Sequence, residues 1–235
     1  RNNKDVIKVI IELQFKHPKI NLKKHYQRYF QLLGLKGILF ISILMSKNII
    51  NKCFTSRFSE KSFSLYQIAS KNKLAYFKVA DVNSPSTIAL LQKHKIDYII
   101  NSGNQIYKRD ILKVYQGKIL NRHSSLLPNY GGIYPIFWQL LQGYKKGGVS
   151  LHWINEKIDE GEIAYSKPME IDPKLSLFDH YKIAFEISYE LCQKAINDMK
   201  IDKLSYIPLK GEKSYFSWPS KKNIKAFKSK KLRIV

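Results

Sequence analysis

One stretch of the sequence is Ile119-Leu-Asn-Arg-His-Ser-Ser-Leu-Leu-Pro128. It begins with the pattern of a short apolar strand, continues with polar residues and ends in a turn. Residues two apart on a strand share a face, so we expect Asn121 and His123 to project side by side. Pro128 and the pair Gly131-Gly132 then end the strand and turn the chain. A carboxamide and an imidazole at the carboxyl end of a strand stand where open α/β sheets bind ligands. The plainer interpretation is that Asn121 is a turn residue and His123 an ordinary surface histidine.

The sequence on both sides of this stretch alternates between strand-like and helix-like patterns. β-Branched and apolar runs predict strands at 5–14, 74–80, 97–102, 148–154 and 162–170. Helical spacing of apolar residues predicts helices at 21–52 (with a break near Gly34), 60–72, 85–94, 134–144 and 177–199. The apolar run from Gly37 to Met45 could instead be a buried strand, because periodicity does not separate the two. The alternation predicts an α/β fold with a Rossmann-like, mostly parallel twisted sheet and helices on both faces.

A basic and aromatic segment follows the last predicted helix. Residues 200–235 contain eleven Lys or Arg against two Asp or Glu, which is +9 of the chain's formal charge of +23. We expect residues 1–199 to form one domain and residues 200–235 to be a short C-terminal extension packed on it, because the extension is too short for a core of its own. The basic charge favours acidic partners such as nucleotides, nucleic acid or anionic membrane. The abundance of Lys, Ile and Asn together offers a compositional explanation instead.

Several other classes of site are disfavoured. Cys53 and Cys192 lie far apart in helix-like sequence, which predicts reduced structural thiols in a cytoplasmic protein rather than a disulfide. The run from Gly37 to Met45 is too short to cross a bilayer, which takes about 20 residues, so no membrane span is expected. The Cys and His spacings indicate no metal site, and no glycine-rich motif indicates a P-loop or a dinucleotide site.

A second stretch supports a more specific interpretation. Gly148-Val-Ser-Leu-His-Trp-Ile-Asn-Glu-Lys-Ile-Asp-Glu-Gly-Glu-Ile163 has the pattern of a strand, a polar excursion and a tight turn into another strand. Together with the stretch from Ile119 to Pro128, it resembles the folate-dependent formyltransferase family, most of all its sugar N-formyltransferase branch. The matching motifs are Asn-x-His-x-Ser-Leu-Leu-Pro, Gly-Val-Ser-x-His and Asp-x-Gly-x-Ile, in this order along the chain.

The resemblance implies catalytic roles for three residues. Asn121 would donate a hydrogen bond to the oxyanion of the reaction, His123 would exchange protons near neutral pH, and Asp159 would orient the imidazole and help to remove the proton of the attacking amine. His152 and Ser150 would contact these catalytic residues and help to hold them in position. The plainer interpretation of Asp159 is a turn aspartate before Gly161.

The same resemblance implies the donor and the place where it binds. The donor would be 10-formyltetrahydrofolate, held mostly by backbone groups of two loops, with no metal. The residues expected in these two loops are Ser102, Gly103, Asn104, Gln105, Ile106, Lys157 and Ile158. Residues 1–199 would then be the catalytic domain, and we expect the strand, loop and helix with which family members usually begin to be absent from it.

The acceptor is expected to be a small molecule, an amino sugar on a nucleotide carrier for surface polysaccharide synthesis. A glycinamide ribonucleotide acceptor would call for a Gly/Ser-rich phosphate loop, and methionyl-tRNA for a C-terminal β-barrel domain, and neither is visible in these 235 residues. Both stay as alternatives. The alternative of another class is a non-catalytic nucleic-acid-binding module that uses the basic tail. We expect a cytoplasmic location, and the chain could form oligomers.

Overall fold

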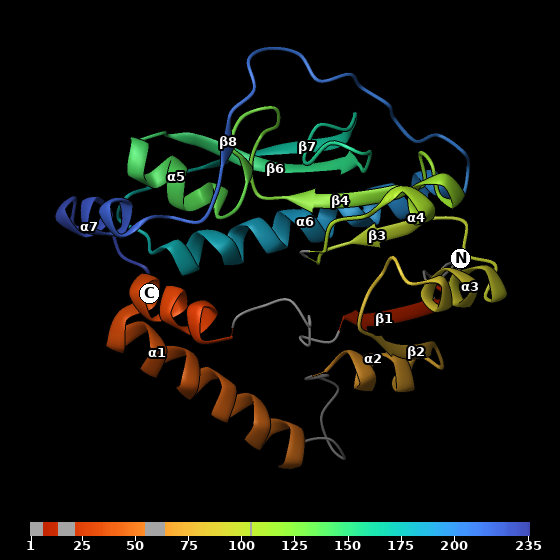
Figure 1. The fold of residues 1–235 in the computed structure, drawn as a ribbon, viewed down its shortest axis with the longest axis horizontal. Coiled ribbons are helices and arrows are strands. Elements are labelled where there is room, and N and C mark those ends of the chain that lie inside the picture. The colour runs from red at the N-terminus through yellow and green to blue at the C-terminus, as the bar shows by residue number, and fades with distance from the viewer. Residues whose placement is uncertain (1–6, 14–21, 55–63, 104) are drawn as a thin grey trace. The chain divides into compact units, whose positions relative to one another are not determined.

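The computed structural model describes residues 7–13, 22–54, 64–103 and 105–235, and the chain divides into two compact units (Figure 1). The first unit is Arg1–Ile96 and the second is Asp97–Val235. The predicted division into residues 1–199 and residues 200–235 is a different one, since the basic tail belongs to the second unit. Each unit is described by itself.

The first unit combines a two-stranded parallel sheet with three helices. Its elements are β1 (Val9–Leu13), α1 (Leu22–Phe54), α2 (Leu65–Lys71), β2 (Ala75–Val79) and α3 (Pro85–Lys93). β1 pairs with β2, and α2 packs against both strands. The strands and helices predicted in this region are present; residues 5–6, 14, 21 and 60–63 of those predictions lie outside the described residues.

Helix α1 resolves the ambiguity of the apolar run from Gly37 to Met45, which is helical. The predicted break is also present, because Gly34 has φ of 64° and divides α1 into two helical pieces. The segment Tyr26–Lys47 has the length and apolar composition to cross a membrane, a property that the shorter run alone did not indicate.

The second unit contains a four-stranded sheet with the order β3-β4-β6-β7 and a separate two-stranded sheet of β5 and β8 (Figure 1). Its elements are β3 (Ile99–Asn101), α4 (Arg109–Val114), β4 (Ile119–His123), β5 (Gly131–Gly132), α5 (Pro135–Gln142), β6 (Lys146–Trp153), β7 (Ile163–Glu170), α6 (Leu177–Met199), β8 (Tyr215–Phe216) and α7 (Lys221–Ser229). The α/β class is confirmed. Helix α4 was not predicted.

The prediction of a mostly parallel sheet is wrong, because the four-stranded sheet is mixed. β3 and β4 are parallel, but β6 runs antiparallel to both β4 and β7. Only residues 154–162 join β6 to β7, whereas a parallel crossover takes a dozen or more residues. Only residues 143–145 join α5 to β6, and the chain re-enters the sheet at the end where β4 finishes. Both short connections turn the strand direction around.

Helix α6 packs against β6 and β7 and supplies much of the core of this unit. Its buried positions recur at helical spacing, among them Ala184, Ile187, Leu191 and Ala195. The predicted N-cap is confirmed, since the side chains of Ser176 and Asp179 form a reciprocal capping box at the first turn. Such a cap contributes about 1 kcal/mol and fixes where the helix begins.

Candidate active site

Strand β4 carries two of the predicted catalytic residues on one face. Asn121 is half-buried and His123 is buried, two residues further along the strand. The neighbouring strand β6 has a register that places His152 opposite Asn121 and Ser150 opposite His123. Residues directly opposite each other on paired strands share a face. The two predicted supporting residues therefore lie beside the two predicted catalytic residues.

Asp159 reaches the same place from the loop between β6 and β7. Its Oδ2 atom lies 3.7 Å from Nδ1 of His123, and its Oδ1 atom lies 3.5 Å from Nε2 of His152. Oδ2 also accepts a hydrogen bond of 2.7 Å from the backbone N–H of Gly132. The structure thus brings Asn121, His123 and Asp159 together, and their chemical roles stay predictions.

Gly161 allows this loop to close. A Cβ atom on Gly161 would lie 1.7 Å from the carbonyl oxygen of Trp153, well inside any allowed contact. The chain can therefore cross the end of β6 at this distance only with glycine. The Asp-x-Gly spacing in this way returns Asp159 to the face of the sheet that carries His123.

Burial sets the protonation state of His123. Its Nε2 lies 2.8 Å from the carbonyl oxygen of Tyr130, so Nε2–H donates to that carbonyl and Nδ1 faces Asp159. Burial lowers the pKa of His123 below its ordinary value and outweighs the opposing effect of the Asp159 carboxylate. The imidazole is therefore neutral at pH 7, and the lone pair of Nδ1 can accept a proton.

The Asp159 carboxyl group stays ionised although it is largely buried. Burial alone would raise its pKa, but the contact with His152 and the backbone N–H of Gly132 together hold the pKa of Asp159 below its usual value. A negative charge thus lies next to a neutral imidazole. This arrangement stabilises a proton that arrives on His123.

The orientation of the Asn121 amide is fixed on both sides. Its Oδ1 accepts a hydrogen bond of 2.7 Å from Nδ2 of Asn101, at the end of β3. Its Nδ2 lies 3.2 Å from Nε2 of His152, whose Nδ1 in turn donates to the carbonyl oxygen of Trp153 at 3.1 Å. Nε2 of His152 thus lies within 3.5 Å of both Nδ2 of Asn121 and Oδ1 of Asp159. The N–H groups of Asn121 therefore point toward the histidine side of the site.

Ser150 supports the turn after β4. Its buried hydroxyl donates to the carbonyl oxygen of Ser125 at 2.8 Å and accepts from the N–H of Leu127 at 3.1 Å. This turn leads to Tyr130, whose carbonyl oxygen holds His123. Ser150 thus acts on His123 through the turn.

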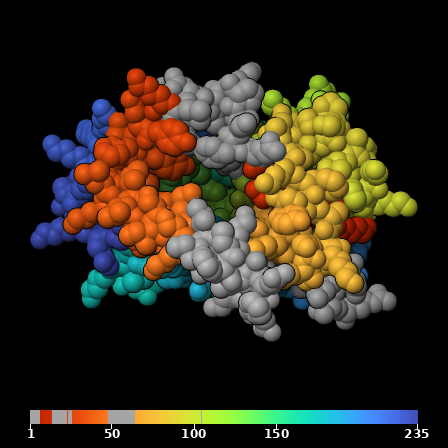
Figure 2. Space-filling view, turned by 90° about the horizontal axis from the view of Figure 1, so that it is seen from below, coloured from red at the N-terminus to blue at the C-terminus, as the bar shows by residue number. Residues whose placement is uncertain are grey.

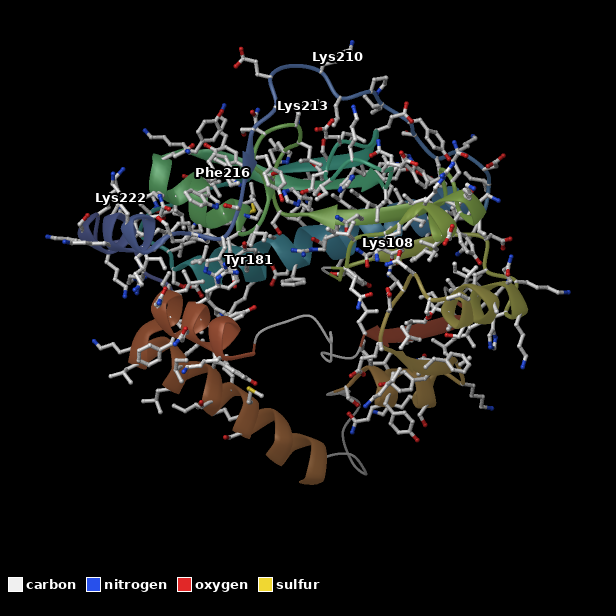
Figure 3. The ribbon with its side chains drawn as sticks, in the orientation of Figure 1. Lys108, Tyr181, Lys210, Lys213, Phe216 and Lys222 are labelled. Carbon is white, nitrogen blue, oxygen red and sulfur yellow. The ribbon has the colours of Figure 1, made fainter. Side chains whose placement is uncertain are left out.

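The basic tail, residues 200–235, lies beside the site. β8 pairs in parallel with β5, and the N–H of Gly131 donates to the carbonyl oxygen of Ser214 at 2.9 Å. Phe216, labelled in Figure 3, stacks on Trp138 of α5 with a centroid distance of 4.9 Å. Because Gly132 lies in β5, the tail holds the N–H group that binds Asp159.

The residues predicted to bind the donor lie on two loops, one after β3 and one before Asp159. Both backbone groups of Gly103 are bound by the side chain of Asn101, at 3.1 and 3.2 Å. The N–H of Lys157 donates to Oδ1 of Asn155 at 2.9 Å. The side chains of Ile106 and Ile158 are 61% and 46% exposed. Ser102 and Gln105 lie in the first loop, and Asn104 lies outside the described residues.

Three contributors to the site were missed in the sequence. Asn101 lies in the strand predicted at 97–102, but nothing in its position in the sequence links it to Asn121. The N–H of Gly132 carries no side-chain signal, although the pair Gly131-Gly132 marks a position where another backbone approaches closely. The carbonyl of Tyr130 is invisible in sequence for the same reason.

The chain is similar to known proteins over parts of both units. The model of the family described as formyl transferase matches residues 47–195. The bifunctional polymyxin resistance protein ArnA of Wigglesworthia glossinidia brevipalpis is 33% identical over 162 residues, which are 67% of this chain and 25% of that protein. The methionyl-tRNA formyltransferase of Finegoldia magna is 31% identical over 119 residues, which are 50% of this chain and 38% of that protein. The chain therefore spans well under half the length of these relatives.

Among solved structures, the formyltransferase PseJ from Anoxybacillus kamchatkensis shares the fold, with a TM-score of 0.56 and 22% identity. The match covers 68% of this chain and 82% of PseJ. That protein was crystallised with UDP-4,6-dideoxy-4-formamido-L-AltNAc and tetrahydrofolate.

Proposed function

The chain belongs to the formyl transferase family, and on that premise we propose that it transfers a formyl group from 10-formyltetrahydrofolate to the amine of a nucleotide-linked amino sugar. The observation that carries the proposal is the convergence of Asn121, His123 and Asp159 at one place, with Asp159 within 3.7 Å of the imidazole. We place this activity in the cytoplasm and, by its acceptor, in the synthesis of surface polysaccharide.

The reaction joins the acceptor nitrogen to the formyl carbon and releases tetrahydrofolate. Asn121 has one amide hydrogen directed at His152 and a second one that can donate to the formyl oxygen as it becomes negative. The loss of one such donor typically costs about 10²–10³ in rate. Nδ1 of the neutral His123 can take the proton that the amine loses on attack, and Asp159 stabilises the imidazolium that results.

The loops beside the site fit the proposed donor in their chemistry. Ile106 and Ile158 offer exposed apolar surface for the flat faces of a pterin ring. The first loop is held in shape by Asn101, and the second by the turn between Asn155 and Lys157. The exposed apolar side chains of Ile106 and Ile158 support a planar heterocyclic ligand in this place.

The aromatic tail supports a nucleotide on the acceptor. Tyr215 is 57% exposed, and its Cδ2 lies 3.7 Å from the position of a Cβ atom on Gly131, with Asp159 Cβ at 3.5 Å from the same point. An exposed ring so near the carboxylate can stack on a base. Lys210 lies on the segment that leads into β8 and can supply positive charge for a diphosphate (Figure 3). Lys213, on the same segment, is paired with Glu160.

The test is an acceptor screen with 10-formyltetrahydrofolate. Tetrahydrofolate release and formylated product should appear with UDP- or dTDP-linked amino sugars. Formylation of glycinamide ribonucleotide or methionyl-tRNA, with none of amino sugars, would overturn the acceptor assignment while keeping the family chemistry. Binding of nucleic acid without any formyl transfer, weakened steeply by salt, would favour the non-catalytic alternative.

Tyr215 provides a finer test of the same acceptor. Tyr215→Ala should raise the KM for the sugar nucleotide about tenfold, because stacking on one base contributes about 1–3 kcal/mol. Tyr215→Phe should behave like the wild type. Tyr189→Ala removes a ring that is 66% exposed on α6. It is the matched control and should leave the KM for the sugar nucleotide unchanged. An unchanged KM in Tyr215→Ala would show that the nucleotide does not bind here.

Asn101 is expected to position Asn121 for the reaction. Asn101→Asp keeps the acceptor for the N–H of Gly103 but cannot donate to Oδ1 of Asn121. The Asn121 amide then loses its fixed orientation, and kcat should fall about tenfold, in line with about 1.4 kcal/mol for one hydrogen bond. The KM for the folate donor should change much less.

Tyr107→Phe is the control for this effect. It removes a hydroxyl that donates to Oδ1 of Asn101 at 3.3 Å, the longest bond of the cluster. Its kcat should stay within about threefold of the wild type, because a long bond contributes little. Equal losses in both variants would mean that the cluster as a whole is structural.

A further inference from the structure

Helix α1 exposes an unusual amount of apolar surface. Eight large apolar side chains between Tyr26 and Met45 are 36% to 76% exposed, and Leu32 is the one buried large side chain among the described residues of this helix. Figure 2 shows α1, in red-orange and orange, open to view on this face. A soluble monomer rarely leaves so many large apolar side chains of one helix in water.

The exposed positions do not form a single stripe. Leu39, Leu44 and Met45 are 63%, 38% and 60% exposed, and at 100° per residue they point to different sides of the helix. A helix that pairs with one other helix carries its apolar residues along one seam. A helix that is apolar all round is suited to a protein core or to lipid.

The charge around this helix has one sign. Residues 13–59 contain nine Lys or Arg and no Asp or Glu. Lys36 and Lys47 are exposed at the two ends of the apolar segment, and eleven residues of helix place them on the same side. Positive charge on both flanks of an apolar segment complements the anionic headgroups of a bilayer.

The segment Tyr26–Lys47 is long enough to cross a membrane, but Lys36 lies near its middle, and a charge at the centre of a bilayer is costly. The position of Lys36 therefore favours a helix that lies in one leaflet. Ten residues separate Lys36 from Lys47, and they span about 15 Å at 1.5 Å per residue. The hydrocarbon core is about 30 Å thick. Both lysines can therefore reach headgroups on the same surface while the residues between them are in contact with acyl chains.

We propose that α1 is a monotopic membrane-binding helix, which holds this formyltransferase on the surface of an anionic bilayer with residues 37–46 inserted in one leaflet. The kink at Gly34 turns the second helical piece away from the first, so the basic first piece can lie on the headgroups. The proposal does not depend on the identity of the acceptor.

Vesicle sedimentation of the full chain tests this proposal. The protein should sediment with vesicles that contain 30% phosphatidylglycerol, and at least tenfold less with pure phosphatidylcholine. Leu35→Glu/Leu39→Glu should lower binding to the anionic vesicles at least tenfold, since these two leucines are 76% and 63% exposed. Ile201→Glu is the matched control, because Ile201 is 59% exposed on the second unit, and it should bind like the wild type.

A tryptophan variant tests insertion without adding a charge. The three natural tryptophans, at 138, 153 and 218, all lie in the second unit. In Leu39→Trp, brominated lipids should quench the emission of the added tryptophan. In Ile201→Trp, they should leave the emission of the added tryptophan unchanged. Both variants should keep the melting temperature and the formyl-transfer rate of the wild type in detergent-free buffer.

Three results would overturn the proposal. The first is no binding to anionic vesicles by a chain that is a monomer. The second is a dimer that Leu35→Glu/Leu39→Glu dissociates, since a second copy would then cover α1. The third is vesicle binding that survives this double variant and is lost when Lys221 and Lys222 are changed to Glu, since the basic tail would then carry the binding.

Discussion

Asp159→Asn is expected to lower kcat by about 10²–10⁴ with little effect on folding or on the binding of the folate donor. Asparagine is nearly isosteric, and its Oδ1 can still accept from the N–H of Gly132, so the loop should keep its shape. The substitution removes the negative charge beside Nδ1 of His123. General acid–base contributions of this kind are worth about 10²–10⁴ in rate. The measurement is single-turnover formyl transfer, with folate affinity by titration.

Glu160→Gln is the matched control for Asp159→Asn. Glu160 is the next residue in the same loop, and its carboxylate is paired with Lys213 at 2.5 Å on the surface. An exposed pair of this kind contributes little, so the kcat of Glu160→Gln should be near that of the wild type. Near-normal turnover in Asp159→Asn would mean that Asp159 is a turn residue and that the proposed proton transfer is wrong.

The pH dependence of stability gives a second readout for the same carboxylate. The pKa of Asp159 is lowered in the folded protein, so its contribution to stability is present above the ordinary Asp pKa of about 3.9 and is lost as the pH falls through the lower folded value. The free energy of unfolding of the wild type should therefore drop more steeply below about pH 4 than that of Asp159→Asn. Urea titrations at a series of pH values measure this difference.

Gly132→Ala is expected to lower kcat by about 10²-fold and to destabilise the fold. A Cβ atom at this position would lie 2.1 Å from the backbone carbonyl oxygen of Phe216, and the φ of 93° is one that L-residues rarely adopt. β5 and β8 must therefore separate, and the N–H that binds Asp159 moves with them. A hydrogen bond to a charged group contributes about 1.5–3 kcal/mol, and the free energy of unfolding should fall by about 2–4 kcal/mol. Steady-state kinetics and chemical denaturation measure the two effects.

Gly211→Ala separates the two causes of this effect. Gly211 lies in the same tail with a φ of 96°, but nothing is within 4 Å of its Cβ position. This variant has the same backbone strain without the contact, so we expect about 1 kcal/mol of destabilisation and an unchanged kcat. If Gly132→Ala also kept its kcat, the tail would not be positioning Asp159.

Local sequence was enough for the elements that depend on neighbouring residues. The capping box of Ser176 and Asp179 and the break at Gly34 were predicted because each is set within a few residues of chain. Asn121 and His123 share a face for the same kind of reason, since the period of a strand is two. The Asp-x-Gly turn could be recognised, but its closure over the carbonyl of Trp153 could not be seen in sequence.

Local sequence did not predict whether neighbouring strands run parallel or antiparallel. Side chains alternate with a period of two in parallel and in antiparallel strands alike, so the patterns at 148–154 and 162–170 predicted strands without their direction. The short connections decided it, and the antiparallel register then placed His152 directly opposite Asn121.

The sequence by itself identified the candidate catalytic side chains, since Asn121, His123 and Asp159 stand in motifs that resemble one family. Only the tertiary structure showed which groups hold these three side chains in position. Gly132 binds Asp159 across 27 residues of chain, and Ser214 binds Tyr130 across 84. These contacts are made by backbone groups or by long-range pairs, which leave no periodic pattern in the sequence because every residue carries the same N–H and C=O groups.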